Sequence, residues 1–457
     1  MGCDVAALEA ELNDFDPRRR RAAVEQLAEA VRCGEISLPA PRPVVNLHQH
    51  SFFSFNGYGY SPSYLAWRSR KEGLLAAGVV DFDVLDAADE FLDAGRRFGI
   101  RTTVGIETRV FFPPFAEKVL NSPGEPGIAY YMGSGFISKE VADPEMLGRL
   151  KEIAQRRNVT MLHRVNPYLK PVEIDYDKDV LPLTPSGNPT ERHLCMAYDA
   201  KAREVFGDTP RLTAFWQEKL GEDAETIRDA LKNPPIIQGL IRARTMKAGG
   251  VGYVKPDGPD FPPLEHMAGF AARAGALPMY AWLDGTTDGE VDPDQLLDLM
   301  TAAGTVAVNI IPDRNWNIKD PETRKGKVAA LHRFVDAARD RGLPISVGTE
   351  MNAYGQPFVD QFEAPELAPV AQEFVRGALI LYGHTVLQRA GGMGYVSDWA
   401  HNRFRSVHDK NDFFAKVGEA VHPECSESVS NLHSAMSPGD VLARLDNQVR
   451  LEQRGGR

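Results

Sequence analysis

Short apolar runs alternate with longer amphipathic stretches along most of the chain from residue 44 onward. The amphipathic stretches, such as 85–98 and 327–341, place apolar residues at helical spacing. Near-continuous apolar strands that alternate with helices are typical of a parallel sheet covered on both faces. Because seven or more such strand–helix units follow one another, the pattern favours a closed β/α barrel over an open sheet. The candidate strands lie at residues 44–51, 78–82, 102–107, 159–163, 250–254, 277–282, 305–310 and 344–348.

The pattern outside these units predicts helices at both ends of the chain and one helical insertion. Residues 4–33 have helical spacing and form the expected N-terminal extension, 1–36, which the proline-rich linker 37–43 separates from the first strand. Its basic run, 18–21, is interpreted as a solvated helix face. The barrel is expected over residues 44–400, with a helical insertion at 200–248. Residues 405–457 are expected to form a peripheral helical segment.

The composition is that of an ordinary soluble globular protein. The 457 residues are 43% hydrophobic and 25% charged, with a formal net charge of −11, which argues against a nucleic-acid partner. No apolar run reaches the roughly 18 residues of a membrane span, and the first residues lack a signal-peptide pattern. The cysteines, Cys3, Cys33, Cys195 and Cys425, show no disulfide or metal spacing. We therefore expect a cytoplasmic protein with no membrane partner; its oligomeric state is not indicated.

Polar side chains recur directly after the candidate strands, where a barrel collects its functional groups. Side chains alternate between the two faces of a strand, so His48 and His50 should point to the same side. Two imidazoles placed this way can hold a divalent ion such as zinc, manganese or iron. Glu107 ends another apolar run, where an unpaired carboxylate would be costly to bury, which also favours a metal ligand. The polar residues that follow the candidate strands, at the expected carboxyl-terminal rim of the barrel, are His48, His50, Asp81, Glu107, His163, Asp284, Asp313 and Glu350.

The order of these motifs resembles the PHP (polymerase and histidinol phosphatase) superfamily over about residues 44–355. The segment Leu47-His48-Gln49-His50-Ser51 is similar to its first motif, His-x-His-Thr/Ser. Val80-Asp81-Phe82-Asp83 stands where the family has Thr-Asp-His-Asp, and Gly105-Ile106-Glu107 resembles its Gly-x-Glu. Gly348-Thr349-Glu350-Met351-Asn352 is similar to the late Gly-Ser-Asp-x-His motif, and the segment ending in Thr190-Glu191-Arg192-His193 resembles a signature of one PHP-like branch. The resemblance implies an α/β fold, a distorted (β/α)7 TIM-like barrel.

The resemblance also implies a ligand set for divalent metal ions, most simply two ions of zinc, manganese or iron. His48, His50 and Glu350 would hold one ion and His163 and His193 the other, with Glu107 between them. The family commonly binds a third ion through three histidines, and this chain has Asn56, Phe82 and Asn352 at those places. Phenylalanine cannot ligate a metal and asparagine offers only a weak neutral oxygen, so we expect the third ion to be lost.

The implied function is metal-dependent hydrolysis of a small anionic molecule, with a phosphoester as the leading substrate and a hydroxide bridging two ions as the nucleophile. Either Asp81 or a metal-bound water would transfer the proton of the leaving group, and Arg192 could contact an anionic substrate or brace Glu191. The candidate substrate-binding residues are Arg164, Lys255, Asp284, Arg314 and Asn352.

Two alternatives stay open. An amidohydrolase-like barrel acting on a sugar acid, lactone or amide also begins with His-x-His, and would need Asp398 as its late metal ligand. A non-catalytic barrel that binds a metal or another ligand is the other alternative. The roles of His384, Asp398 and His401 are left open, and the remaining histidines (His266, His332, His408, His422 and His433) are interpreted as structural.

Overall fold

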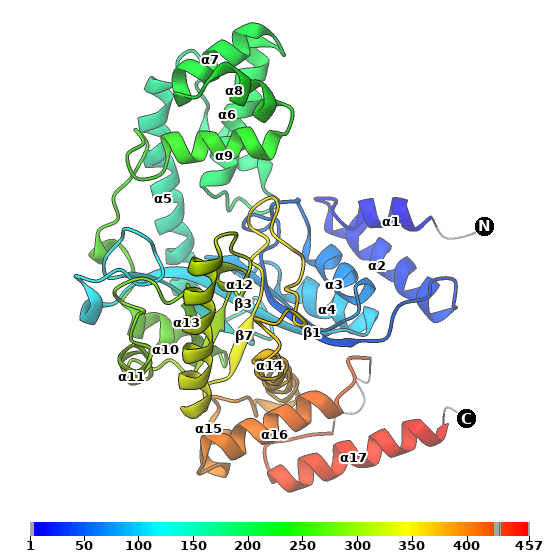
Figure 1. Cartoon of the computed structure of the whole chain (residues 1–457). Coiled ribbons are helices and arrows are strands. Elements are labelled where there is room, and N and C mark those ends of the chain that lie inside the picture. Colours follow the sequence, from blue (N-terminus) through cyan, green and yellow to red (C-terminus); the bar gives the residue numbers. More distant parts are fainter. Residues whose placement is uncertain (1–3, 425–428, 430, 456–457) are drawn as a thin grey trace.

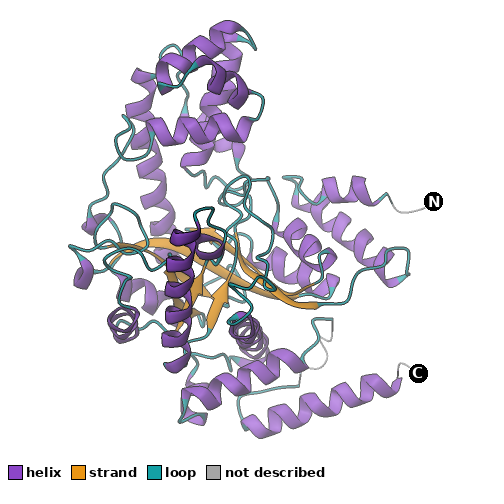
Figure 2. Cartoon of the chain, in the orientation of Figure 1, coloured by secondary structure: helices purple, strands orange, loops and turns teal. Residues whose placement is uncertain are grey.

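A seven-stranded barrel with helices between its strands forms the centre of the computed structural model, which describes residues 4–424, 429 and 431–455 (Figure 1; Figure 2). The strands are neighbours in chain order and are parallel, except that β4 runs antiparallel to β3 and β5. This arrangement is the distorted TIM-like barrel that the sequence predicts. The strands are β1 (Arg42–Gln49), β2 (Leu74–Phe82), β3 (Arg101–Phe111), β4 (Ile128–Ser134), β5 (Leu277–Trp282), β6 (Ala307–Ile310) and β7 (Ile345–Val347).

The barrel closes between β1 and the residues that follow β7. The backbone N–H of Glu350 donates to the carbonyl of His48 at 2.8 Å, and the N–H of His50 donates to the carbonyl of Glu350 at 2.7 Å. Only glycine fits at position 348, because a Cβ there would lie 2.4 Å from the backbone nitrogen of His48. The closure therefore places the Glu350 motif directly against the His-x-His motif.

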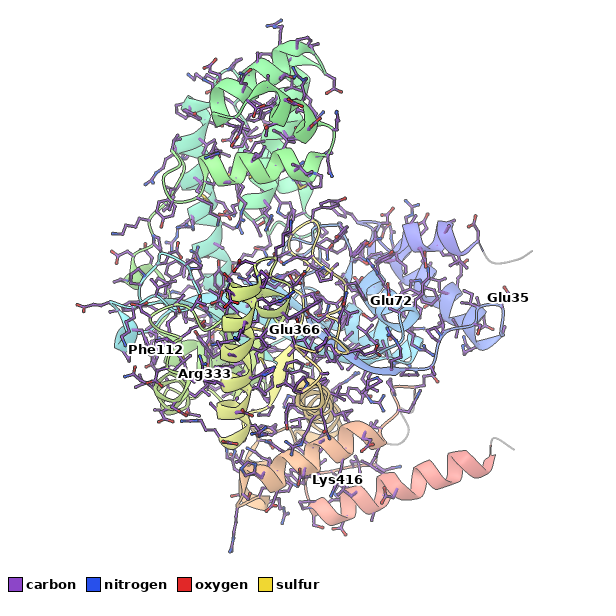
Figure 3. All side chains as sticks on the ribbon, in the orientation of Figure 1. Glu35, Glu72, Phe112, Arg333, Glu366 and Lys416 are labelled. Carbon is purple, nitrogen blue, oxygen red and sulfur yellow. The ribbon has the colours of Figure 1, made fainter. Side chains whose placement is uncertain are left out.

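Amphipathic helices cover the outside of the strands. In α4, Phe91, Leu92 and Phe98 are buried, and the helix ends where Gly99 adopts the left-handed conformation at φ 73°. Other helices expose charged side chains on their outer faces, such as Arg333 on α13 and Lys416 on α16 (Figure 3). The covering helices are α3 (Pro62–Lys71), α4 (Ala88–Phe98), α10 (Leu264–Arg273), α11 (Pro293–Ala302), the short α12 (Asp313–Trp316) and α13 (Pro321–Asp340).

The chain ends contribute further helices. The N-terminal extension forms α1 (Val5–Glu11) and α2 (Pro17–Arg32), and in the basic run Arg20 is buried and paired with Glu90 while its neighbours are exposed. Near the C-terminus, α14 (Ala371–Gly391) packs against β1, β2, β3 and β7. It approaches so closely that a Cβ on Gly377 would meet the carbonyl oxygen of Ile345. The described residues that follow form α15 (Asp398–Arg403), α16 (Val407–Ala420) and α17 (Pro438–Gly455).

A lobe made of helices is inserted between β4 and β5 and projects from the barrel (Figure 1). It has its own hydrophobic core, in which Leu194, Tyr198, Trp216 and Ile237 are fully buried. Its helices are α5 (Pro144–Tyr168), α6 (Glu191–Phe206), α7 (Pro210–Leu220), α8 (Ala224–Leu231) and α9 (Pro234–Thr245). Residues 200–248 are largely helical, as expected, but the lobe begins earlier, at α5. Short helical turns lie at Pro113–Phe115, Tyr176–Val180, Leu181–Leu183 and Gly258–Asp260.

Two predicted strands are wrong and one strand was not predicted. Residues 159–163 belong to α5, because a five-residue segment with a few apolar positions is as compatible with one face of a long helix as with a strand. Residues 250–254 form turns and irregular backbone. The strand that the pattern missed is β4. Among the described residues, no helix has both the length and the apolar composition needed to cross a bilayer.

Candidate metal centre

Three buried side chains converge where β1 ends and where β3 leaves its pairing with β2, at Glu107. The Nε2 atoms of His48 and His50 lie 3.3 Å apart, and Oε2 of Glu107 lies 3.4 Å and 3.3 Å from them. All three are nearly inaccessible to solvent. Among the described residues they form a group of nitrogen and oxygen ligands close enough to hold one metal ion.

Hydrogen bonds behind the two histidines fix which ring nitrogen faces the cluster. Nδ1 of His48 lies 2.9 Å from Oδ1 of Asn309, which can only accept, so Nδ1 carries the proton. Nδ1 of His50 lies 3.2 Å from Oγ of Ser54, whose hydroxyl donates to Asp81, so this Nδ1 is also the donor. Both Nε2 lone pairs therefore point at each other and at a carboxylate, an arrangement that is repulsive unless a proton or a metal cation lies between them. This donor set fits a divalent metal.

The electrostatics of the cluster reflect the same need for positive charge. Burial alone would lower the pKa of His48, but the carboxylate of Glu107 outweighs it and the pKa is raised. Burial alone would raise the pKa of Glu107, but His48 and His50 hold it at about 2. The carboxylate of Glu107 is thus ionised and available as a ligand.

Asp81 lies behind the cluster and does not line the cavity in front of it. One carboxylate oxygen accepts from the backbone N–H of Ser51 at 2.8 Å and the hydroxyl of Ser54 at 2.6 Å, and the other accepts from the Ser51 hydroxyl at 2.6 Å. The expected catalytic role of Asp81 is not supported by this geometry. The side chain instead positions His50 through Ser54.

Glu350 is buried beside the cluster but its carboxylate is already engaged. Arg314 donates to its two oxygens at 2.8 Å and 3.0 Å, and Gln356 donates to one of them at 3.2 Å. Burial would raise the pKa of Glu350, but Arg314 and then His48 lower it. The expected metal ligand and the expected substrate-binding arginine therefore form an ion pair with each other.

The residues that replace the histidines of the third metal position have other contacts. Phe82 stacks on the ring of His50 with centroids 4.2 Å apart. Asn56 donates from its side chain to the carbonyl of His50 at 2.8 Å. Asn352 lines the cavity, as does Phe82.

The two histidines expected to bind a second ion do not join the cluster. His163 is exposed on α5, because the segment is helical, and it does not line the cavity. His193 is buried at the start of α6, where its Nδ1 accepts from the backbone N–H of Thr190 at 3.0 Å. That bond leaves the proton on Nε2, so neither nitrogen presents a free lone pair. Burial lowers the pKa of His193 to about 3.

Three of the expected substrate-binding residues also lie elsewhere. Arg164 is exposed on α5, where it donates to the carbonyl of Tyr253, and Lys255 is exposed. Asp284 is buried in an ion pair with Lys327 at 2.6 Å. None of the three lines the cavity, since the strands expected before Arg164 and Lys255 are absent and Asp284 turns away toward α13.

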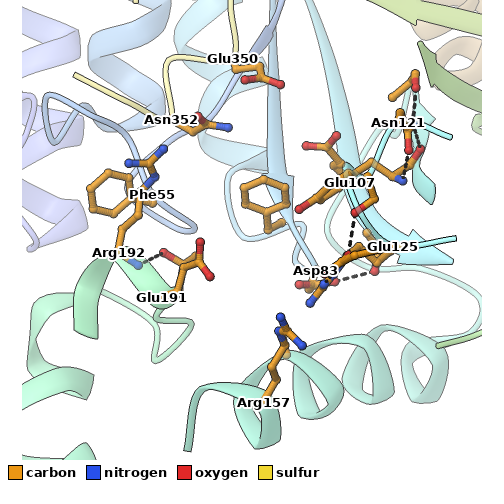
Figure 4. Close-up of a pocket in the computed structure, with 18 of the residues that line it drawn as sticks. Phe55, Asp83, Glu107, Asn121, Glu125, Arg157, Glu191, Arg192, Glu350 and Asn352 are labelled. Atoms are coloured by element: carbon orange, nitrogen blue, oxygen red, sulfur yellow. Dashed lines mark hydrogen bonds and ion pairs between the residues drawn. The ribbon is translucent and has the colours of Figure 1, made fainter. Parts of the chain in front are cut away.

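A cavity of about 570 Å³ opens in front of the cluster, between the barrel and the helical lobe (Figure 4). Its size is that of a small-molecule site. His48, Glu107, Arg192, Arg314, Glu350 and Asn352 line it as the sequence predicts. Charged residues that the sequence analysis missed line it as well: Asp83, Arg109, Glu125, Arg157, Glu191, Arg242 and Lys247.

Asp83 is the carboxylic acid of this missed set with no ion pair in the described structure. It is held at φ 63° and accepts from the hydroxyl of Thr108 at 2.6 Å. Burial raises its pKa to about 7, against the opposing effect of the Thr108 hydrogen bond. The available signal was its position directly after the strand that ends at Phe82, where a barrel collects its functional groups.

The residues whose roles were left open do not contribute to the cavity. His384 is buried in α14, where Nε2 donates to the carbonyl of Gly135 at 3.0 Å and Nδ1 accepts from the N–H of Tyr395 at 2.9 Å. Asp398 and His401 are exposed on α15. Asp398 is therefore not placed to serve as the late ligand of an amidohydrolase-like centre.

The fold and the cluster define a distorted TIM-like barrel with a candidate metal centre at its rim. No protein-family model and no curated protein matches the chain. Among solved structures, an amidohydrolase from Chromobacterium violaceum with bound sulfate and no metal is similar, with 17% identity and a TM-score of 0.47 over 73% of this chain and 96% of that one. A protein from Bifidobacterium adolescentis named as a metal-dependent phosphoesterase has 18% identity and a TM-score of 0.46, over 74% and 98%. Likenesses this distant say nothing of this chain's chemistry, and membership of the PHP superfamily stays a prediction.

Proposed function

We propose that this chain is a metal-dependent hydrolase of a small anionic molecule, with phosphoester hydrolysis as the leading reaction. The observation that carries the proposal is the pair of Nε2 lone pairs, from His48 and His50, that face each other and Glu107 at 3.3–3.4 Å. A divalent ion at this place would act as a Lewis acid and lower the pKa of a water molecule, which is the chemistry that hydrolysis requires.

We further propose one ion per chain in place of the two that the motifs imply. The described residues offer one group of three ligands, and the histidines expected for a second ion lie outside it. The ion pair with Glu350 fixes the guanidinium of Arg314 next to the cluster, where its N–H groups are hydrogen-bond donors held in place. Donors of this kind stabilise negative charge that develops on a substrate during attack.

Other cavity residues take the remaining roles in this proposal. Arg192 and Asn352 face the same side of the cavity (Figure 4) and are placed to orient an anionic group. Asp83 lines the cavity without an ion pair, and we assign it the proton transfer for which the sequence offers Asp81 as a candidate. Its carboxyl group can donate or accept a proton, whereas the oxygens of Asp81 are occupied by serine donors.

The test measures metal content and activity together. Chelator-treated protein is reconstituted with manganese or zinc, and bound metal is counted per chain by emission spectrometry. The same samples are assayed with phosphomonoesters, phosphodiesters, lactones and amides. We expect about one ion per chain and hydrolysis of phosphoesters, both lost in His48→Ala and both retained in His401→Ala, which changes an exposed histidine on α15. Wild-type protein that stays metal-free, or that hydrolyses a substrate equally well with and without metal, would contradict the proposal.

A further inference from the structure

The positive charges in the cavity are not all balanced by carboxylates. Arg109 pairs with Glu125 at 3.3 Å, Arg314 pairs with Glu350 at 2.8 Å, and Arg242 and Lys247 share Glu191. Arg157 and Arg192 also line the cavity, and neither has a carboxylate within ion-pair distance in the described part of the chain. The whole protein is acidic, with a net charge of −11, so two unpaired guanidinium groups in one cavity need a reason.

The two unpaired arginines lie on different sides of the cavity. Arg192, at the start of α6, points toward Phe55 and Asn352, and its guanidinium lies 5.5 Å from the centre of the Phe55 ring (Figure 4). Arg157 extends from α5 toward Asp83 and Glu125 on the β3 side (Figure 4). Arg192 therefore lies on the same side of the cavity as Glu350, whereas Arg157 lies near Asp83 and Glu125 (Figure 4).

The surroundings of Arg157 concentrate positive charge. Its side chain donates to the backbone carbonyl of Val254 at 2.5 Å, which balances no charge. Burial lowers its pKa, and the next largest influence is repulsion from Arg109. The nearby carboxylate of Glu125 is already divided between Arg109 and the hydroxyl of Ser122. An anion bound here would offset the cost of burying the guanidinium of Arg157 and would reduce its repulsion from Arg109.

We propose that Arg157, with Arg109 beside it, forms a second anion-binding subsite that takes a phosphate, sulfate or carboxylate group of the substrate distant from the bond that is cleaved. Guanidinium groups bind such anions through paired, charge-assisted hydrogen bonds. This inference rests on the proposed function in one respect, namely that the molecule bound at the subsite is the substrate of the hydrolase. The substrate is then a small molecule with two anionic groups, one for each side of the cavity.

The test uses inorganic phosphate and sulfate as probes and needs no turnover. Chelator-treated wild-type protein and variants are heated with increasing phosphate or sulfate, and chloride at equal ionic strength serves as the reference. A ligand that binds the folded protein raises Tm according to its affinity, so the dose dependence gives the dissociation constant. Arg164→Gln is the matched control, because Arg164 lies on the same helix and donates to the adjacent carbonyl, that of Tyr253.

We expect phosphate and sulfate to raise Tm of the wild type beyond chloride, and Arg157→Gln to weaken this binding by about 10-fold or more, the cost of losing a charged hydrogen-bond donor. Arg164→Gln should bind as the wild type does. Equal affinity in Arg157→Gln and wild type, equal weakening in Arg164→Gln, or no effect beyond chloride would each overturn the subsite. His48→Ala should retain the Arg157-dependent binding, so failure of the metal centre and failure of the subsite give different results.

Discussion

The hydrogen bond between Asn309 and His48 offers a strict test of how the cluster is prepared for metal. Asn309 is fully buried on β6, accepts from Nδ1 of His48 at 2.9 Å, and donates to Ser346 at 3.2 Å. In Asn309→Ala the imidazole of His48 loses the partner that directs its free lone pair toward the cluster. Removing such a partner typically costs 10- to 100-fold in metal affinity, or about 1.4–2.7 kcal/mol.

The control for this prediction is another buried asparagine with two hydrogen bonds. Asn411, on α16 and outside the lining of the cavity, donates to the carbonyl of Gly342 at 2.8 Å and accepts from the hydroxyl of Tyr395 at 2.6 Å. Both alanine variants should lose about 1–3 kcal/mol of unfolding free energy in the metal-free state, because each leaves buried polar groups unpaired. Asn309→Ala alone should also lose metal affinity.

The assay titrates manganese or zinc against a chromogenic chelator and measures denaturant unfolding of the metal-free proteins. An Asn309→Ala variant that binds metal as tightly as the wild type would refute this role of Asn309. An equal loss of metal affinity in Asn411→Ala would refute it as well, since the effect would then follow from general destabilisation.

Three further predictions concern catalysis, pH and packing. Asp83→Asn should lower kcat at least 100-fold in a steady-state assay with metal content unchanged, as loss of a proton-transfer group does; an unchanged kcat would remove Asp83 from the mechanism. Burial holds the pKa of His384 at about 4, below its usual 6.5, so the folded form resists protonation. The contribution of neutral His384 to the free energy of unfolding is therefore fully present above pH 6.5 and should fall by about 3 kcal/mol as the pH drops toward 4. In unfolding curves measured across this range, His384→Gln should lose less stability than the wild type does. Gly348→Ala would place a Cβ 2.4 Å from the backbone nitrogen of His48 and should cost about 1–3 kcal/mol in the same measurement, whereas Gly326→Ala, with open space around it, should be neutral or slightly stabilising; equal effects would contradict the packing argument.

The barrel could be predicted because its strands are buried on both faces and therefore read as apolar runs bounded by polar residues. The same criterion failed at 159–163, where Met161, Leu162 and Val165 are buried along one face of α5. A run of five residues does not distinguish the two cases. It also missed β4, although Ile128–Ser134 is apolar and aromatic and is preceded by a turn-rich segment, which is the usual signal of a strand.

Site residues on the barrel strands could be predicted from the sequence. Site residues on segments that meet only in the folded chain could be predicted much less well. His48, His50 and Glu107 follow from strand alternation and from the cost of burying a carboxylate. The assignment of His193 failed because a histidine at the start of a helix can cap the backbone, as it does here. The cationic lining from Arg157 depends on how the lobe packs over the barrel, which no local pattern in the sequence encodes.

The central claim is that one cation is held by His48, His50 and Glu107, and diffraction from crystals soaked with manganese or zinc tests it most directly. We expect one strong anomalous peak per chain, within about 2.0–2.2 Å of both Nε2 atoms and of the Glu107 carboxylate. A peak at His163 or His193 instead, or no peak at this cluster after soaking, would contradict it.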